Sequence, residues 1–181
     1  MSSAVSYCAF PTALGHAAIA WGGNGVVGVW LPEPDAAAAR RRVARRLPSA
    51  REAAPTPEVR DAISRITDLL AGSPADLTAV PLDLERVPEL HRRVYAVARS
   101  VPAGQTTTYG EIAARLGDRS LSREVGRALG ANPFPLVVPC HRVLAAGGKT
   151  GGFSAPGGVS TKLRLLEIER ARVPGVPTLF R

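Results

Sequence analysis

The sequence places a nucleophile and a base side by side at Cys140 and His141. They stand in the run Pro139-Cys140-His141-Arg142-Val143. A thiolate is the form of cysteine that attacks electrophiles, and a neighbouring imidazole can accept the thiol proton. A lone cysteine is more often a small buried apolar residue. The pair is therefore a candidate nucleophile whose function depends on its surroundings.

The residues on either side of this pair predict a strand followed by a loop. Pro135-Leu136-Val137-Val138 is too short for a helix and rich in β-branched residues, which favours a buried strand. Gly147-Gly148 and Gly151-Gly152 predict a loop whose backbone can approach a ligand closely. We therefore expect the thiol between a strand and a ligand-binding loop.

The charge of the chain favours a polyanionic partner. The 181 residues include 23 Lys and Arg against 15 Asp and Glu, which gives a net charge of +8 and a pI near 10.7. Nucleic acid is the first candidate for such a partner, and an anionic membrane surface is the second. The hydrophobic fraction of 45% is that of an ordinary globular protein, so the chain can build a core.

Cysteine and histidine usage argues against a disulfide framework and against a metal site. Cys8 and Cys140 are the only cysteines, no C-x-x-C pair occurs, and His16, His91 and His141 are scattered. The N-terminus lacks the pattern of a signal peptide, and no apolar run approaches the ~20 residues that span a membrane. These features predict an intracellular protein in which a reactive thiol can survive.

Residues 1–82 are predicted to form an α+β unit. The expected strands cover 5–10, 16–21, 26–31 and 77–82, and the expected helices cover 35–47 and 59–70. The first helix carries Arg40, Arg41, Arg42, Arg45 and Arg46. These arginines either contact a phosphate backbone or form a solvated helix face, and we favour the solvated face.

Beyond a linker at 83–88, the sequence predicts two short helices joined by a tight turn. Thr108 and Glu111 fit a capping box, and Ser120 can cap a second helix that ends near Asn132. This arrangement is typical of a helix-turn-helix. The outward positions of the second helix are Arg123, Gly126, Arg127 and Gly130. Such a face suits approach to a DNA groove without base readout, although an ordinary helical hairpin has the same pattern.

From near Leu90 to near Ala171, about half of the chain, the sequence resembles the O6-alkylguanine-DNA alkyltransferases, also called methylated-DNA–protein-cysteine methyltransferases. The matching motifs are Val101-Pro102-Ala103-Gly104-Gln105-Thr106, Tyr109-Gly110-Glu111, Arg123-Glu124-Val125-Gly126, Asn132-Pro133, Pro139–Val143, Gly151-Gly152-Phe153-Ser154 and Lys162–Glu169. Pro-Cys-His-Arg-Val in this order of motifs is highly specific to the family.

The resemblance implies an α+β fold with two domains. An N-terminal RNase H-like α/β domain would cover 1–82, and a C-terminal helical winged-helix or helix-turn-helix domain with the cysteine would cover 83–174, before a tail at 175–181. It also implies a monomer that acts on double-stranded DNA and uses no cofactor and no metal. The alkyl group on O6 of guanine, or on O4 of thymine as a further candidate lesion, would move irreversibly to Cys140 in a single turnover.

The resemblance further assigns roles to individual residues. His141 would polarise the Cys140 thiol through a bound water, Glu169 would orient His141, and Asn132 would tie the active-site turn to the helix-turn-helix. Tyr109 would help to rotate the nucleotide and donate a hydrogen bond to guanine, and Arg123 would fill the gap left by the flipped base. The further DNA-binding positions are Gly126, Arg127 and Ala131, and the pocket positions are Pro139, Val143, Phe153 and Ser154.

Some positions depart from the common family pattern. Glu124 adds a negative charge beside the finger arginine, and Arg127 could compensate it. Phe153 replaces a common tyrosine, and the loop from Phe153 to Lys162 is two residues longer than in many members. Three other functions are alternatives: an alkyltransferase-like protein that binds damage without repair, a thiol hydrolase and a sequence-specific transcription factor. The presence of Cys140 disfavours the first. A hydrolase is disfavoured because adjacent Cys and His residues rarely form a direct nucleophile–base pair and because it leaves the helix-turn-helix unexplained. The lack of base-reading side chains disfavours the transcription factor.

Overall fold

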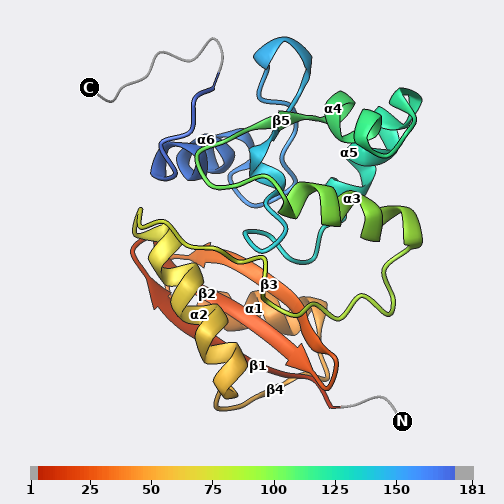
Figure 1. Ribbon diagram of the computed structural model, residues 1–181. Coiled ribbons are helices and arrows are strands. Elements are labelled where there is room, and N and C mark those ends of the chain that lie inside the picture. The colour runs from red at the N-terminus through yellow and green to blue at the C-terminus, as the bar shows by residue number, and fades with distance from the viewer. Residues whose placement is uncertain (1–3, 174–181) are drawn as a thin grey trace. The chain divides into compact units, whose positions relative to one another are not determined.

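The computed structural model describes residues 4–173, which form two compact units. The first unit contains residues 4–86 together with Pro133–Val137, and the second contains residues 87–132 and 138–173. The larger sheet lies in the first unit and most of the helices lie in the second (Figure 1). The mixed α+β class predicted from the sequence is confirmed. The predicted tail at 175–181 lies outside the described residues.

A four-stranded sheet with the order β3-β2-β1-β4 is the centre of the first unit. β1 (Ser6–Thr12), β2 (Gly15–Gly22) and β3 (Gly25–Glu33) are antiparallel neighbours, whereas β4 (Arg51–Glu52) pairs with β1 in parallel. The central strand β2 is the most buried, and Ala17 to Ala20 are fully inaccessible to solvent. The three long strands were predicted correctly, because turn residues and apolar segments alternate clearly there.

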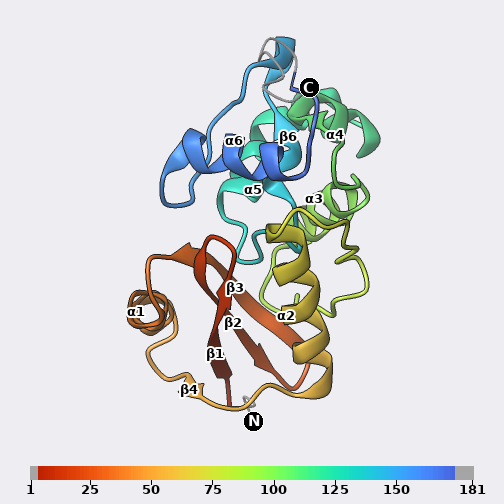
Figure 2. The same ribbon diagram turned by 90° about the vertical axis from the view of Figure 1, so that its left-hand side faces the viewer.

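One helix covers each face of this sheet (Figure 2). α1 (Ala36–Arg46) begins where the Asp35 carboxylate accepts a hydrogen bond from Ala38 N at 2.7 Å, as predicted. It packs Ala39 and Val43 against the sheet. α2 (Pro57–Leu70) is capped by Thr56 and buries Val59, Ala62, Ile66, Leu69 and Leu70.

The predicted strand over 77–82 is wrong. The segment turns instead, with Val80 N donating to Leu77 O at 3.2 Å, and only Leu82 forms an isolated bridge, with Val26. Pro81 has no N–H to donate, so the segment cannot add a regular edge to the sheet. The short strand β4 was not predicted, because two exposed residues give no periodicity.

The second unit contains the two predicted short helices joined by a turn. α3 (Glu89–Arg99) and α4 (Tyr109–Arg115) both pack on α5 (Ser122–Gly130). The capping box of α4 is confirmed: Glu111 N donates to Thr108 Oγ1 at 3.1 Å, and Thr108 N donates to a Glu111 carboxylate oxygen at 2.7 Å.

Ser120 does not cap the second helix. A short 3-10 turn, η1 (Arg119–Leu121), comes first, and the Asp118 carboxylate caps it by accepting from Ser120 N at 2.8 Å. α5 therefore begins at Ser122. An aspartate two residues earlier offers a competing acceptor, which local spacing alone could not rank against the serine.

The chain that carries the motif Pro139–Val143 consists of short elements. A 3-10 turn, η2 (Cys140–Arg142), leads into β6 (Val143–Leu144), which pairs in parallel with β5 (Thr107–Thr108). A second 3-10 turn, η3 (Ala146–Gly148), and a loop then lead to α6 (Gly158–Ile168). Lys162 therefore lies on α6, and only residues 153–157 of the lengthened segment are loop.

The predicted strand at Pro135–Val138 is also wrong, although its burial is right. Leu136, Val137 and Val138 are at most 2% exposed, but they form a turn in which Leu136 has a φ of 73°. Prolines on both sides remove backbone donors, so the segment cannot sustain a ladder. A positive φ is unusual for a residue with a γ-branched side chain, and the surrounding core holds it in place.

None of the helices between residues 4 and 173 has the length and apolar character needed to cross a bilayer.

Candidate active site

Cys140 is the first residue of the turn η2, and its surface is partly exposed. Its backbone N–H donates to Val138 O at 2.8 Å, and the Asn132 side chain donates to the same carbonyl at 2.9 Å. Asn132 lies two residues after the end of α5, so it links that helix to the turn that presents the thiol. Its predicted position beside the active-site turn therefore agrees with the geometry.

The environment of the thiol favours its neutral form in the resting protein. Burial raises the pKa of Cys140, while hydrogen bonds from Asn132 and from the backbone N–H groups of Cys140 and His141 and the charge of Lys162 act in the opposite direction. The sequence suggested a thiolate held by the adjacent histidine. The structure instead surrounds a thiol with donors that would stabilise negative charge once the proton leaves.

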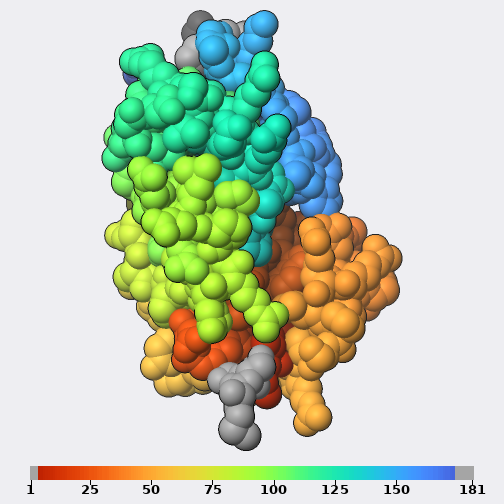
Figure 3. Space-filling model, turned by 90° about the vertical axis from the view of Figure 1, so that its right-hand side faces the viewer, coloured from red at the N-terminus to blue at the C-terminus, as the bar shows by residue number. Residues whose placement is uncertain are grey.

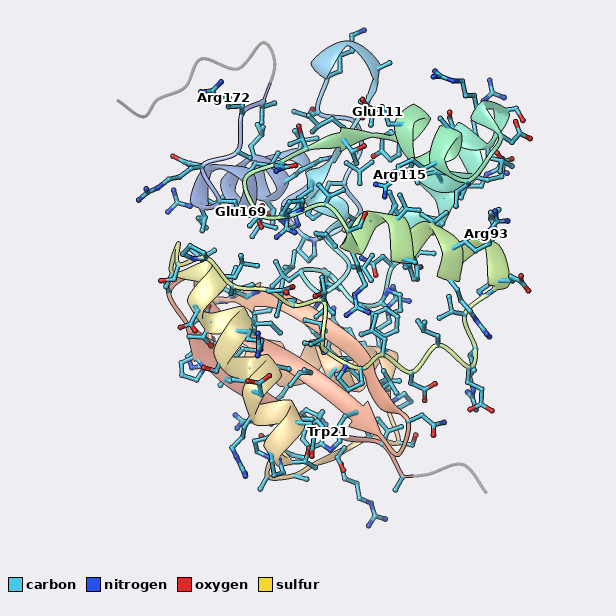
Figure 4. All side chains as sticks on the ribbon, viewed as in Figure 1. Trp21, Arg93, Glu111, Arg115, Glu169 and Arg172 are labelled. Carbon is cyan, nitrogen blue, oxygen red and sulfur yellow. The ribbon has the colours of Figure 1, made fainter. Side chains whose placement is uncertain are left out.

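His141 is buried, and it points one ring nitrogen at a carboxylate. His141 Nε2 lies 2.8 Å from Glu169 Oε1, although 28 residues separate the two in the chain. Glu169 ends α6 (Figure 4) and its side chain is 2% exposed. The predicted pairing of these two residues is therefore formed.

The protonation states of this pair follow from their surroundings. Burial acts to raise the pKa of Glu169, but hydrogen bonds and charge from His141 and Arg142 outweigh it and lower the pKa to about 2. Burial lowers the pKa of His141. An ionised Glu169 can only accept, so Nε2 of a neutral His141 carries the hydrogen and Nδ1 keeps its lone pair. Nδ1 is buried and has no hydrogen-bond partner among the described residues, so it is the nitrogen that can act as a base.

Arg142 is a site residue that the sequence analysis did not single out. Its Nε and one terminal nitrogen donate to the two oxygens of Glu169 at 2.9 and 2.7 Å, and its other terminal nitrogen donates to Val101 O at 2.7 Å. This bidentate contact fixes the carboxylate that holds His141. The only signal in the sequence was a charged residue directly after the candidate pair.

Lys162 is the second residue that sequence reasoning left without a function. Its side chain is fully buried, and Nζ donates to the carbonyls of Val143 and, at 3.4 Å, Gly152. Nζ also lies 5.8 Å from the centre of the Tyr109 ring. Burial lowers the pKa of Lys162 to about 8, against an opposing contribution from Cys140. A signal existed, because only two of the 23 basic residues in the chain are lysines.

Tyr109 is the first residue of α4, and its hydroxyl faces the pocket loop. The hydroxyl donates to Gly152 O at 3.5 Å, a long contact. Burial raises the pKa of Tyr109, so the hydroxyl keeps its proton at neutral pH. Tyr109 and Lys162 thus share one carbonyl acceptor, which brings the helix-turn-helix and the loop together.

The predicted pocket residues lie on both sides of the thiol in the chain. Pro139 is buried and directly precedes Cys140 in the chain. Val143 is buried at the start of β6. Ser154 donates to Gly130 O at 3.0 Å, which ties the loop to the end of α5. Phe153 is half-buried in the same loop.

The predicted DNA-binding face lies on α5. Arg123 and Arg127 are exposed, and a Cβ built on Gly126 or Gly130 would meet nothing within 4 Å, which agrees with an open surface. Ala131 ends the helix. The predicted pairing of Glu124 is confirmed, because Arg127 lies 3.5 Å from its carboxylate.

The residues between 4 and 173 contain no group of three or more His, Cys, Asp or Glu side chains that could hold a metal ion. Cys8 lies on β1 in the first unit, whereas Cys140 belongs to the second. The two free thiols are therefore not paired with each other.

Comparison with known proteins agrees with this geometry. Residues 89–171 match the family model for the DNA-binding domain of 6-O-methylguanine DNA methyltransferase. The chain is 39% identical over 120 residues to the methylated-DNA–protein-cysteine methyltransferase of Mycobacterium tuberculosis, covering 66% of this chain and 70% of that protein. It is 40% identical over 124 residues to the protein of the same name from Methanothermobacter thermautotrophicus, covering 68% of each.

Solved structures extend the similarity to nearly the whole chain. The crystal structure of Mycobacterium tuberculosis O6-methylguanine methyltransferase matches with a TM-score of 0.73 and 31% identity, over 98% of this chain and 99% of that one. The structure of the M. tuberculosis protein in complex with DNA matches with a TM-score of 0.68 and 30% identity, over 97% and 99%. On this evidence, the chain belongs to the family of methylated-DNA–protein-cysteine methyltransferases.

Proposed function

We propose that this protein repairs alkylated DNA by transferring the alkyl group from O6 of guanine to its own Cys140, once per molecule. The observation that carries the proposal is the site itself: the partly exposed Cys140 directly precedes His141 in the chain, and His141 is buried and held by Glu169, which Arg142 also binds. Such a cluster has no evident purpose beside an inert cysteine, because burying three ionisable side chains is costly.

The transfer is a displacement at the alkyl carbon. The sulfur forms a bond to that carbon, the carbon–O6 bond breaks, and its electron pair stays on guanine, which takes up one proton at a ring nitrogen. The thiol loses one proton. The product is a thioether, which no group in the site can cleave, and this accounts for a single turnover.

His141 is the proposed acceptor of the thiol proton. Its free nitrogen is Nδ1, because Nε2 donates to Glu169. A water molecule can carry the proton from the sulfur to Nδ1, as the family resemblance implies. The imidazolium that forms is stabilised by the ionised Glu169 beside it.

Tyr109 is the proposed donor to the leaving guanine. Its hydroxyl is protonated at neutral pH and makes only a long contact in the resting site, so it is available for a stronger acceptor. Arg123 on the exposed face of α5 is proposed to occupy the place of the flipped nucleotide, with Gly126, Arg127 and Ala131 against the backbone. O4-alkylthymine is a second candidate lesion for the same chemistry.

The finer architecture is part of the proposal. The sheet of the first unit with a helix on each face suits an RNase H-like domain at 1–82, and α4, α5 and the β5–β6 pair suit a winged helix-turn-helix at 83–174. We further propose that the protein acts as a monomer, inside the cell, on double-stranded DNA.

Mass spectrometry tests the transfer directly. After incubation with duplex DNA that contains one O6-methylguanine, the protein is expected to gain one methyl group, located on Cys140 by peptide mapping. Cys140→Ala is expected to bind the duplex but gain nothing, and Cys8→Ala serves as the matched control and is expected to react like the wild type. A methyl group on Cys8, or an unmodified protein after complete binding, would overturn the proposal; the second result would favour a damage-binding protein.

A further inference from the structure

Helix α1 differs from the other α-helices in its charge. It carries Arg40, Arg41, Arg42, Arg45 and Arg46 and no carboxylate. Every other α-helix between residues 4 and 173 contains at least one Asp or Glu. In α2 and α5 these acids pair with arginines of the same helix, as in Asp61–Arg65 at 2.8 Å.

Four of the five arginines of α1 are exposed to solvent. Ala39 and Val43 are fully buried, whereas Arg40, Arg41, Arg45 and Arg46 are exposed. The remaining exposed positions of this helix are alanines, which leave the surface smooth. Figure 3 shows the orange segment that contains α1 as part of the solvent-facing surface.

Only part of this charge is neutralised within the protein. Arg40 pairs with Glu52 at 2.8 Å and Arg42 with Glu33 at 3.3 Å. Arg41, Arg45 and Arg46 form no ion pair with any residue in the range 4–173. We call these three residues the α1 arginine patch.

The patch does not serve the stability of the helix. Arg41–Arg45 and Arg42–Arg46 are like charges at i,i+4, and each such pair costs a helix roughly 0.2–0.5 kcal/mol. The helix dipole compensates for Arg45 and Arg46 in the last turn, but not for Arg41, which stands further from that end. An unfavourable arrangement at the surface points to an anionic partner outside the chain.

We propose that the α1 arginine patch binds phosphate groups of double-stranded DNA and forms a second contact surface, apart from α5. Charge complementarity supports this occupant, since guanidinium groups bind phosphate through paired donors. Three exposed cations within six residues at the end of one helix suit the repeating charges of a DNA backbone. The contact carries no sequence information, so it would hold the protein on DNA irrespective of the lesion.

Local charge, rather than net charge, is the basis of this assignment. Residues 1–86 contain nine basic and nine acidic side chains, so the first half of the chain has no general attraction to polyanions. Residues 87–181 contain fourteen basic and six acidic side chains. Any DNA affinity that depends on the first half must therefore come from a concentrated patch.

The test neutralises the patch and compares it with a matched change elsewhere in the first unit. Arg41→Gln/Arg45→Gln/Arg46→Gln removes three charges from α1. Arg60→Gln/Arg65→Gln/Arg86→Gln removes three charges from other parts of the first unit and leaves the same net charge as the α1 variant. Binding of both variants and the wild type to a long lesion-free duplex is measured as a function of salt concentration.

The α1 variant is expected to bind roughly tenfold more weakly at low salt, and its slope of log affinity against log salt should be smaller by about 2.7, the value for three lost phosphate contacts. The control variant should keep the wild-type slope. Equal slopes for all three proteins would overturn the proposal and would leave an acidic protein or a membrane surface as the partner of α1.

Duplex length distinguishes two sources of the phosphate groups. If the same duplex reaches both surfaces, the loss of affinity will be present on a long duplex and absent on one of ~10 base pairs. If a second duplex binds to α1, the wild type will bridge two labelled duplexes and the α1 variant will not. Either result supports the patch, whereas an absence of both effects counts against it.

Two further measurements test whether the substitutions in α1 affect folding or the transfer reaction rather than DNA binding. The melting temperature of the α1 variant should equal or slightly exceed that of the wild type, because repulsion within the helix is relieved. Methyl transfer from a saturating short duplex should proceed at the wild-type rate. Loss of transfer in both variants would indicate damage to the protein, and loss in the α1 variant alone would contradict a lesion-independent contact.

Discussion

Two buried cations lie near the thiol, and they are held by different kinds of partner. Arg142 binds both oxygens of Glu169 and one backbone carbonyl. Lys162 binds two backbone carbonyls and approaches the Tyr109 ring, and no carboxylate in the described part of the chain pairs with it. The charge of Arg142 is therefore balanced in the resting protein, whereas that of Lys162 is balanced only when Cys140 is a thiolate.

This difference gives the two cations different roles in the proposed mechanism. The Arg142 side fixes the tautomer of His141 and hence the base. On the proposed mechanism, the Lys162 side supplies positive charge where negative charge develops. The two sides also titrate in different pH ranges, because the pKa of Glu169 is lowered from 4.5 to about 2 and that of Lys162 from 10.5 to about 8.

The largest effect is expected from Glu169→Gln. The substitution leaves the charge of Arg142 buried without an opposite charge and removes the ionised acceptor that orients His141, so the transfer rate should fall by about 10²–10⁴-fold. Single-turnover transfer from a methylated duplex measures the rate. Glu167→Gln on the same helix, an exposed pair with Arg164, is the matched control and should react normally. A Glu169→Gln rate within twofold of this control would remove the carboxylate from the mechanism.

Substitution of Arg142 should change the titration of His141. The arginine charge helps to keep the pKa of His141 low, so Arg142→Met should raise that pKa and favour an imidazolium–carboxylate pair. Arg142→Lys keeps the positive charge but loses the bidentate contact, so the pKa of His141 should change less in this variant than in Arg142→Met. NMR titration of the ring protons in a Cys140→Ser background reports the pKa without interference from alkylation. Identical titrations in all variants would mean that Arg142 serves packing alone.

The free energy of unfolding at alkaline pH should reveal the cost of burying the charge of Lys162. Its pKa is 10.5 when unfolded and about 8 when folded, so the cost of burying the charge applies below pH 8. The contribution of Lys162 to stability should therefore rise between pH 8 and 10.5, by up to about 3 kcal/mol, because the unfolded chain binds the extra proton.

Lys162→Met should lack this rise, which chemical denaturation at several pH values would reveal. In contrast, the contribution of Glu169 is complete above its unfolded pKa of 4.5 and is lost as the pH falls towards 2. Parallel stability curves for the wild type and Lys162→Met above pH 8 would show that the lysine is not buried in its charged form.

The smallest effect on stability is expected from Tyr109→Phe. The lost hydrogen bond to Gly152 is 3.5 Å long, so the free energy of unfolding should change by less than about 1 kcal/mol. Transfer should slow more than this value suggests, because the proposed role of the hydroxyl is to donate to the leaving guanine. A variant that reacts at the wild-type rate would assign the proton donor to another group.

The parts of the structure that depend on local chemistry were predictable from the sequence. The caps at Asp35 and Thr108 use side chains within three residues of their partners, and the hairpin before Gly25 uses adjacent turn residues. Cys140 and His141 were identified because they are neighbours in the chain. Glu169 was assigned only through the family resemblance.

The contacts that give the site its chemistry were not predictable in this way. Arg142 meets Glu169 across 27 residues and Val101 across 41, and Lys162 meets Val143 across 19. No periodicity encodes such pairs. The turn at Leu136 was misassigned for a related reason, since β-branched composition indicates burial in a core but not the backbone conformation that the core imposes.

The membership of Pro133–Val137 in the first unit limits how this protein can be divided. Pro133 O accepts a hydrogen bond from Val29 N at 2.9 Å, and Phe134, Leu136 and Val137 are buried. A fragment that starts at residue 87 would include the catalytic motif but leave these three side chains without their packing partners. We expect such a fragment to self-associate, and we expect co-expressed residues 1–86 to restore its solubility. Because Pro133–Val137 belongs to the first unit, no single cut in the chain can separate the two units.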